Sequence, residues 1–222
     1  MTDPVAVVLR RGFGIMARGS LRGIWAHGRP PAGGFVWAAD HQSWWDPFLA
    51  SVVLERSGHQ AALLMQQENL DQYEFVRRVG VFGSEEARQG LDYLGEGRAL
   101  VIFPEGELRP AGPLGPLHGG ASWYAVHAGV PLVGVAVRVL MRGHQAPEAY
   151  LSFEPVETTG TVPEVTERLQ TRLAAALADL DALLRRTEPR TVPPGFVPLL
   201  RGRLSMDERI DRFASRIPGR RR

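Results

Sequence analysis

The sequence predicts a single α/β domain with a mixed, mostly parallel sheet flanked by helices, preceded by an N-terminal amphipathic helix. Its length of 222 residues suits one compact domain with a substantial core. Short apolar runs, such as 35–39 and 99–103, alternate with stretches of helical periodicity. The hydrophobic fraction of 44% and the charged fraction of 23% are those of an ordinary globular protein.

The first element is a predicted helix over residues 5–26, within an N-terminal segment 1–30. Apolar residues such as Val8 and Phe13 alternate there with Arg10 and Arg11. Two interpretations share this periodicity. The helix lies in a bilayer interface with its arginines near lipid phosphates, or it packs on the domain with those arginines solvated.

The central segment, 31–187, carries the alternation that defines the predicted domain. Proline and glycine at 30–34 mark a turn before the first strand. We expect strands at 35–39, 61–65, 81–83, 99–103, 132–139 and 150–153, and helices at 44–56, 69–79, 84–95, 119–128 and 162–186. Leucines at helical spacing make the last of these a long amphipathic helix.

The C-terminal extension, 188–222, begins with a proline-rich stretch to residue 198 that we expect to be extended. A short amphipathic stretch follows at 206–217. The chain closes on Arg220, Arg221 and Arg222, a basic tail that is either solvated or in contact with anionic lipid.

Composition excludes several kinds of chemistry. The sequence has no cysteine, so it contains neither disulfides nor a thiolate nucleophile. It has no lysine either, which excludes a Walker phosphate loop and Schiff-base catalysis. No apolar run approaches the roughly 20 residues that span a bilayer, and no secretory cleavage site follows the first apolar run. We therefore expect a cytoplasmic protein whose membrane contact, if any, is peripheral.

The most informative pattern is His41 followed by Asp46, placed between a predicted strand and the next helix. Histidine is suited to take a proton near neutral pH, and a nearby carboxylate can fix its tautomer. No Gly-x-Ser-x-Gly elbow supplies a protein nucleophile. The pair therefore indicates that a substrate hydroxyl attacks, unless His41 is simply a loop histidine and Asp46 a helix-start carboxylate.

A second segment, Phe103 to Arg109, follows another predicted strand and reads Phe-Pro-Glu-Gly-Glu-Leu-Arg. Its proline and glycine predict a tight turn that presents Arg109 and backbone N–H groups to an anion. The alternative is an ordinary turn with a solvated arginine.

Other chemistry finds little support in the sequence. His118 and His127 are too far apart to share one helical face, and no His-Glu-x-x-His occurs, so we predict no metal site. No motif for RNA or DNA recognition is present, and we expect no nucleic-acid partner.

With these two segments the sequence resembles the glycerolipid and lysophospholipid acyltransferase family. The family's first block, an Asn- or Asp-His followed after four residues by Asp, matches Asp40, His41 and Asp46. Its Phe-Pro-Glu-Gly block matches residues 103–106, with Arg109 slightly displaced. Its Val-Pro-rich fourth block is partly matched by residues 130–135.

The resemblance implies acyl transfer from an acyl thioester, either acyl-CoA or acyl carrier protein, to a lipid hydroxyl. His41 would be the general base and Asp46 its orienting partner. Glu105, Gly106 and Arg109 would lie in the acceptor site, and neither a metal nor a bound cofactor would be needed. The protein would work at the inner face of the cell membrane.

Departures from the family pattern concern the acceptor. Ser84 and two acidic residues stand near the family's second-block arginine, and Arg88 comes late. Gln66 and Gln67 stand where a lysine is common, and Gly134 replaces a proline. A lysophospholipid acceptor therefore remains alongside two alternatives: a non-phosphorylated glycolipid or isoprenoid acceptor, and a non-catalytic lipid-binding protein of the same fold.

Overall fold

The computed structural model describes residues 4–215. Within that range one sheet contains eight strands in the order β4-β3-β5-β2-β6-β7-β1-β8. The strands are β1 (Gly23–His27), β2 (Phe35–Ala39), β3 (Ala61–Met65), β4 (Val81–Gly83), β5 (Ala99–Ile102), β6 (Leu132–Leu140), β7 (Glu148–Val156) and β8 (Val197–Arg201). The pairs β6–β7 and β1–β8 are antiparallel and the other pairs are parallel. The predicted mixed, mostly parallel sheet is confirmed.

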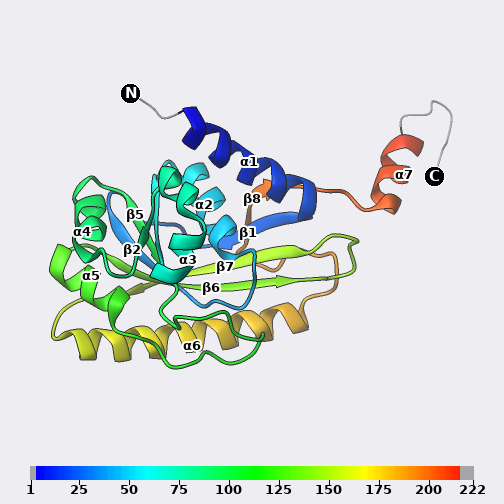
Figure 1. Cartoon of the computed structure of the whole chain (residues 1–222). Helices are drawn as coiled ribbons and strands as arrows, with labels where there is room; N and C mark the ends of the chain where they lie inside the picture. The colour runs from blue at the N-terminus through cyan, green and yellow to red at the C-terminus, as the bar shows by residue number, and fades with distance from the viewer. Residues whose placement is uncertain (1–3, 216–222) are drawn as a thin grey trace.

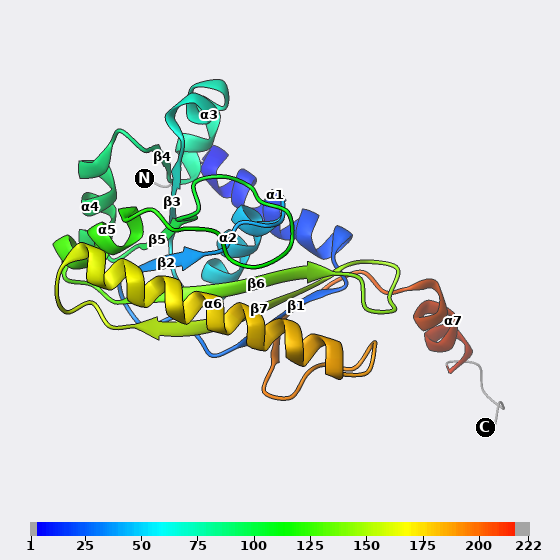
Figure 2. The same ribbon diagram turned by 90° about the horizontal axis from the view of Figure 1, so that it is seen from below.

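Helices cover both faces of this sheet. They are α1 (Pro4–Ser20), α2 (Asp46–Arg56), α3 (Gln67–Gln72), the 3₁₀ helix η1 (Glu74–Val79), α4 (Ala87–Gly95), α5 (Gly120–Ala128), α6 (Val162–Arg186) and α7 (Met206–Ala214). Figure 1 shows α1 and α2 above the sheet and α6 below it, and in Figure 2 α6 runs across β6 and β7.

The central strands are buried on both faces because helices lie on both sides. Every residue of β2 and β5 is buried, as expected of parallel strands in a three-layer domain. Alternate side chains enter two cores: Trp37 packs toward α1 and α2, whereas Val36 and Ala38 pack toward α4 and α5. Leucines of α6 form a third cluster against β6 and β7.

The predicted N-terminal helix is correct only as far as Ser20. Residues 23–27 form β1, which pairs in parallel with β7 and buries Ile24 and Trp25. Trp25 stacks on Tyr150 of β7 at 5.4 Å between ring centroids. The pairing partner lies more than a hundred residues away, so local periodicity carried no signal for this strand.

Smaller boundary errors have local causes. The helix expected from residue 84 begins at Ala87, because residues 83–86 form a turn instead. In this turn the Glu86 N–H donates to the Gly83 carbonyl at 3.0 Å, and the Glu86 carboxylate accepts the Gly83 N–H at 2.8 Å. The helix expected from residue 44 begins at Asp46. In the C-terminal extension β8 forms an edge strand and α7 ends at Ala214, whereas Ile217 and the three terminal arginines lie outside the described residues.

Segments 1–30 and 188–222 each contribute a strand to the sheet of the central segment, β1 and β8 respectively. β1 and β8 pair with each other, and near the end of α1 the Gly202 N–H donates to the Arg22 carbonyl at 3.0 Å. Both flanking segments are thereby attached to the same corner of the domain.

Candidate active site

His41 follows β2 at the carboxyl end of the sheet, where α/β domains place their ligands. Its Nδ1 lies 3.0 Å from Oδ2 of Asp46, the first residue of α2. The same oxygen accepts the backbone N–H groups of Gln42 at 2.9 Å and Ser43 at 2.8 Å. These two bonds hold the carboxylate in one position at the start of the helix.

This geometry determines which nitrogen of His41 is available. A carboxylate oxygen is an acceptor, so the neutral ring carries its proton on Nδ1 and its lone pair on Nε2. The ring also stacks on Phe103 at 4.3 Å with an interplanar angle of 22°. Its side chain keeps 20% of its surface exposed, whereas Asp46 is buried. The imidazole is therefore held at Nδ1 by Asp46, while part of its surface stays accessible.

The Phe103–Arg109 segment is bonded directly to the His41 loop, because β2 and β5 are parallel neighbours whose carboxyl ends meet. Oε1 of Glu105 accepts the His41 N–H at 3.0 Å, and the Arg109 N–H donates to the His41 carbonyl at 2.8 Å. The other oxygen of Glu105 accepts the Gly115 N–H at 2.8 Å. The two segments singled out in the sequence thus form one unit, with Glu105 as a buried link.

Gly106 lies at the turn of this segment with φ of +75°, a conformation that favours glycine. A Cβ atom there would approach Cδ2 of His118 to 3.1 Å. The turn therefore brings backbone close to a second imidazole.

Two carboxylates lie beside Arg109. Its Nη2 lies 2.6 Å from Oε1 of Glu107, and its Nε lies 3.5 Å from Oε2 of Glu105. Arg109 does not line either of the two cavities beside His41. Arg88, the late arginine of the second block, is exposed on α4 and does not line them either.

His41 lies where two cavities of about 500 Å³ each meet. The first has polar side chains in its wall, namely Gln66, Asn69, Ser84, Glu107 and His118. The second is mainly apolar and is lined by α1, α2, β3 and η1, including Phe13, Trp44, Phe48, Phe75 and Val76. Pro47, Leu63, Met65 and Leu108 belong to both walls. Most of the surface of the first cavity is apolar too, so the two cavities differ in the polar side chains of the first.

A buried charged cluster beneath His41 was not foreseen from the sequence. Asp40 accepts the Val137 N–H at 2.7 Å and contacts Nη1 of Arg138 at 3.2 Å. Arg138 also makes a bidentate pair with Asp181 of α6, at 2.7 and 3.0 Å, and donates to the Gly112 carbonyl at 3.1 Å. Burial raises the pKa of Asp40 to about 8, against the lowering effects of the Val137 N–H and Arg138.

Gly112 is held by the His41 loop as well. The side chain of Gln42 donates to its carbonyl at 3.0 Å and accepts its N–H at 3.1 Å. Arg138 and Gln42 therefore fix the loop after the Phe-Pro-Glu-Gly turn against His41. An arginine inside an otherwise apolar strand was the one sequence signal that could have identified this cluster.

Among residues 4–215, no group of three or more His, Asp or Glu side chains is placed to hold a metal ion. Over the same range, no helix is both long enough and apolar enough to cross a membrane.

A family model described as Acyltransferase matches residues 26–138. The match covers half of the chain and contains both His41 and the Phe-Pro-Glu-Gly turn. The chain belongs to the acyltransferase family. The resemblance inferred from the two segments is thereby confirmed.

A solved structure with the same fold is the 1-acyl-sn-glycerophosphate (LPA) acyltransferase PlsC from Thermotoga maritima. It is 20% identical, with a TM-score of 0.60 over 80% of this chain and 78% of that chain. At this identity the likeness concerns the fold. No curated protein matches the sequence.

Proposed function

We propose that this protein transfers an acyl group from an acyl thioester, acyl-CoA or acyl carrier protein, to a hydroxyl of a lysophospholipid or related lipid. The observation that carries the proposal is the oriented, partly open imidazole of His41 at the junction of two cavities, of which one has polar side chains in its wall. The family supports acyl transfer in general; donor, acceptor and residue roles are our proposal.

In the proposed reaction Nε2 of His41 takes the proton of the acceptor hydroxyl as its oxygen attacks the thioester carbonyl. The carbon–sulfur bond then breaks, and the imidazolium returns the proton to the leaving thiolate. Asp46 stabilises the imidazolium that forms in between. The thioester brings a good leaving group, so positioning and proton transfer are the main tasks of the protein, and neither metal nor cofactor is required.

The apolar cavity is the proposed site of a fatty acyl chain, and the first cavity, with its polar side chains, takes the acceptor head group beside Gly106. Glu105 lines neither cavity and would act by holding the turn that carries Gly106. Phe13 of α1 and Trp44 lie in the apolar wall, and Ile15 and Trp44 are also exposed. We therefore propose that α1 contacts the membrane surface from which lipids enter, and that the enzyme works peripherally on the cytoplasmic side.

A non-phosphorylated acceptor is the second candidate, and the environment of Arg109 favours it. Two carboxylates, Glu105 and Glu107, lie beside this guanidinium. Their negative charges oppose the approach of a phosphate. The polar wall offers amides, a hydroxyl, an imidazole and a carboxylate, which suit hydroxyl groups of a sugar or glycerol.

The deciding experiment uses two acceptors that differ only by the phosphate, lysophosphatidic acid and the corresponding monoacylglycerol, together with a glycolipid. Each is incubated with labelled acyl-CoA or acyl carrier protein, and products are identified by mass. His41→Ala is expected to abolish transfer, whereas His127→Ala, at an exposed histidine of α5, leaves it unchanged. Equal turnover by wild type and His41→Ala would refute the role of the base.

Arg109→Gln separates the two acceptor candidates. If Arg109 turns toward a phosphate, this change raises KM for the phosphorylated acceptor and leaves KM for the neutral acceptor unchanged. If the acceptor is neutral, both KM values stay within about twofold. If no acceptor gives a product with either donor, the result favours a non-catalytic lipid-binding protein.

A further inference from the structure

The C-terminal helix α7 turns its apolar side away from the domain, whereas an ordinary amphipathic surface helix turns it toward the core. Its apolar residues Met206, Ile210 and Phe213 are 57%, 59% and 71% exposed, and no residue of the helix is buried. A surface helix normally turns its apolar side chains toward the core. Here they point into solvent.

The polar side of α7 is the side attached to the domain. Arg22 pairs with Glu208 at 2.6 Å, and Arg190 pairs with Asp207. At the first turn the Met206 N–H donates to the Gln145 side chain at 2.8 Å, and Ser205 forms a capping box with Glu208. These contacts fix the rotation of the helix about its axis, so its apolar side faces outward.

Charged side chains flank this apolar stripe. At about 100° per residue, the three apolar side chains fall within a stripe about 60° wide, with Arg209 on one border and Asp207 on the other. Asp207 and Glu208 are paired with Arg190 and Arg22, so their charges are balanced by the domain. The remaining charges of the helix are those of Arg209, Arg212 and Asp211, a positive balance that suits a surface that is both apolar and negatively charged.

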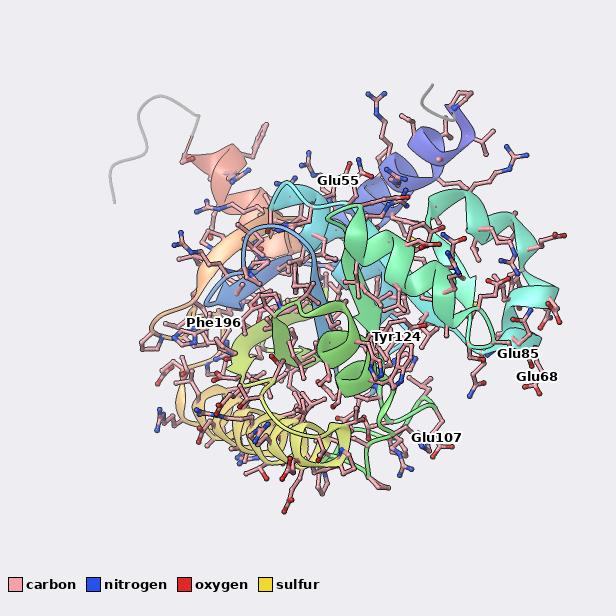
Figure 3. All side chains as sticks on the ribbon, turned by 90° about the vertical axis from the view of Figure 1, so that its left-hand side faces the viewer. Glu55, Glu68, Glu85, Glu107, Tyr124 and Phe196 are labelled. Atoms are coloured by element: carbon pink, nitrogen blue, oxygen red, sulfur yellow. The ribbon has the colours of Figure 1, made fainter. Side chains whose placement is uncertain are left out.

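The position of α7 relates this stripe to the proposed active site. Arg22, which pairs with Glu208, lies two residues after the end of α1. Figures 1 and 3 show α1 and α7 on one side of the sheet and α6 on the other. Large exposed apolar side chains occur on α1 and α7, and at the apolar cavity (Trp44, Phe75); α6 has none.

We propose that α7 is a second membrane-binding helix, which inserts Met206, Ile210 and Phe213 into an anionic bilayer beside α1. Attachment at two points along one side of the sheet would hold the apolar cavity toward the lipid. This inference goes beyond the proposed reaction and does not depend on His41.

The absence of cysteine from the sequence allows a direct test on the full-length protein. Phe213→Cys is labelled with a polarity-sensitive dye and titrated with vesicles of phosphatidylcholine and phosphatidylglycerol. The matched control is Val192→Cys, an exposed apolar position in the loop between α6 and β8. We expect a blue shift at position 213 and none at position 192, and no blue shift at either with phosphatidylcholine alone.

A second measurement uses vesicle sedimentation. Ile210→Ser with Phe213→Ser should weaken binding by at least about tenfold, because two large apolar side chains are lost from the lipid contact. Val192→Ser should leave binding unchanged. Circular dichroism should show the wild-type unfolding midpoint for both variants, since the changed side chains point away from the domain.

Three outcomes would overturn the proposal. The first is sedimentation with vesicles that the double substitution leaves unchanged. The second is an unshifted dye at position 213 while the protein is vesicle-bound. The third is a blue shift that rises with protein concentration in the absence of lipid, which would identify a second copy of the chain as the occupant. Acyl transfer can be measured separately in each case, so a failure here leaves the proposed reaction open.

Discussion

Replacing Asp46 by asparagine isolates the orienting role of the carboxylate with little change in shape. In the structure one oxygen of Asp46 accepts three N–H groups, from His41, Gln42 and Ser43. The amide oxygen of asparagine can occupy the same position, because an NH₂ group there would face three donors. The geometry of the loop is then kept while the negative charge is lost.

The size of the effect follows from those three bonds. A hydrogen bond to a charged group contributes about 1.5–3 kcal/mol and a neutral one about 0.5–1.5 kcal/mol, so the change costs about 3 kcal/mol of stability. For a chain of this length that lowers Tm by about 6–12 °C. The imidazolium loses its counter-charge, and we expect kcat to fall roughly 10²- to 10⁴-fold. Asp46 lines neither cavity, so both KM values should change little.

The assay is release of free thiol from the acyl thioester, with saturating acceptor, at a temperature well below the Tm of the variant. A double-mutant cycle provides the control: in the His41→Ala background, Asp46→Asn should have almost no further effect on kcat. A loss of less than tenfold in folded Asp46→Asn enzyme would show that the carboxylate does not assist the base. Equal losses with and without His41 would assign Asp46 to folding alone.

Three further predictions concern the surroundings of His41. At pH values above about 8, where Asp40 is ionised, Arg138→Met should lower the free energy of unfolding by about 3–5 kcal/mol because it leaves the buried Asp40 charge without its partner. Asp181→Asn, at a partly exposed partner, should cost about 1 kcal/mol. Denaturant titration in that pH range compares the two, and equal costs would contradict this reasoning. Burial raises the pKa of Asp40 from 3.8 to about 8, so the native state keeps a proton that the unfolded chain releases, and the contribution of Asp40 to stability falls as pH rises between those values. Asp40→Asn should remove that dependence, up to about 1.4 kcal/mol per pH unit, and parallel stability–pH curves for the two proteins would refute it. Gly106→Ala should lower the free energy of unfolding by about 1–2 kcal/mol, because the positive φ is unfavourable for alanine, and a lower Tm would show this. The new Cβ atom would also crowd the His118 ring, and we expect this to raise KM for the acceptor.

Much of the central domain could be predicted because its signals are local. The β2 and β5 strands are short, fully apolar runs bounded by turn residues, and the leucine spacing of α6 places one side of a 25-residue helix on the sheet. The pairing of His41 with Asp46 also follows from local spacing, since only four residues separate them in the loop that joins a strand end to a helix start.

The features that could not be predicted depend on contacts between distant parts of the chain. β1 becomes a strand through β7, and β8 becomes a strand through β1. Arg109 is a different case, because the two carboxylates beside it, Glu105 and Glu107, belong to its own segment. Their closeness in the sequence did not show that the turn brings them to the guanidinium. Arg138 required the packing of α6 on β6 before its partner Asp181 could be known.

The edge-to-face contact between Phe13 and Phe48, at 5.2 Å, ties α1 to the wall of the apolar cavity. A shortened protein prepared for easier handling by removing α1 would therefore lose one side of that cavity. Low turnover of such a fragment would then result from the incomplete apolar cavity as well as from the lost membrane contact of α1. Point substitutions at outward positions such as Val8 and Ile15 separate the two effects, because they leave Phe13 in place.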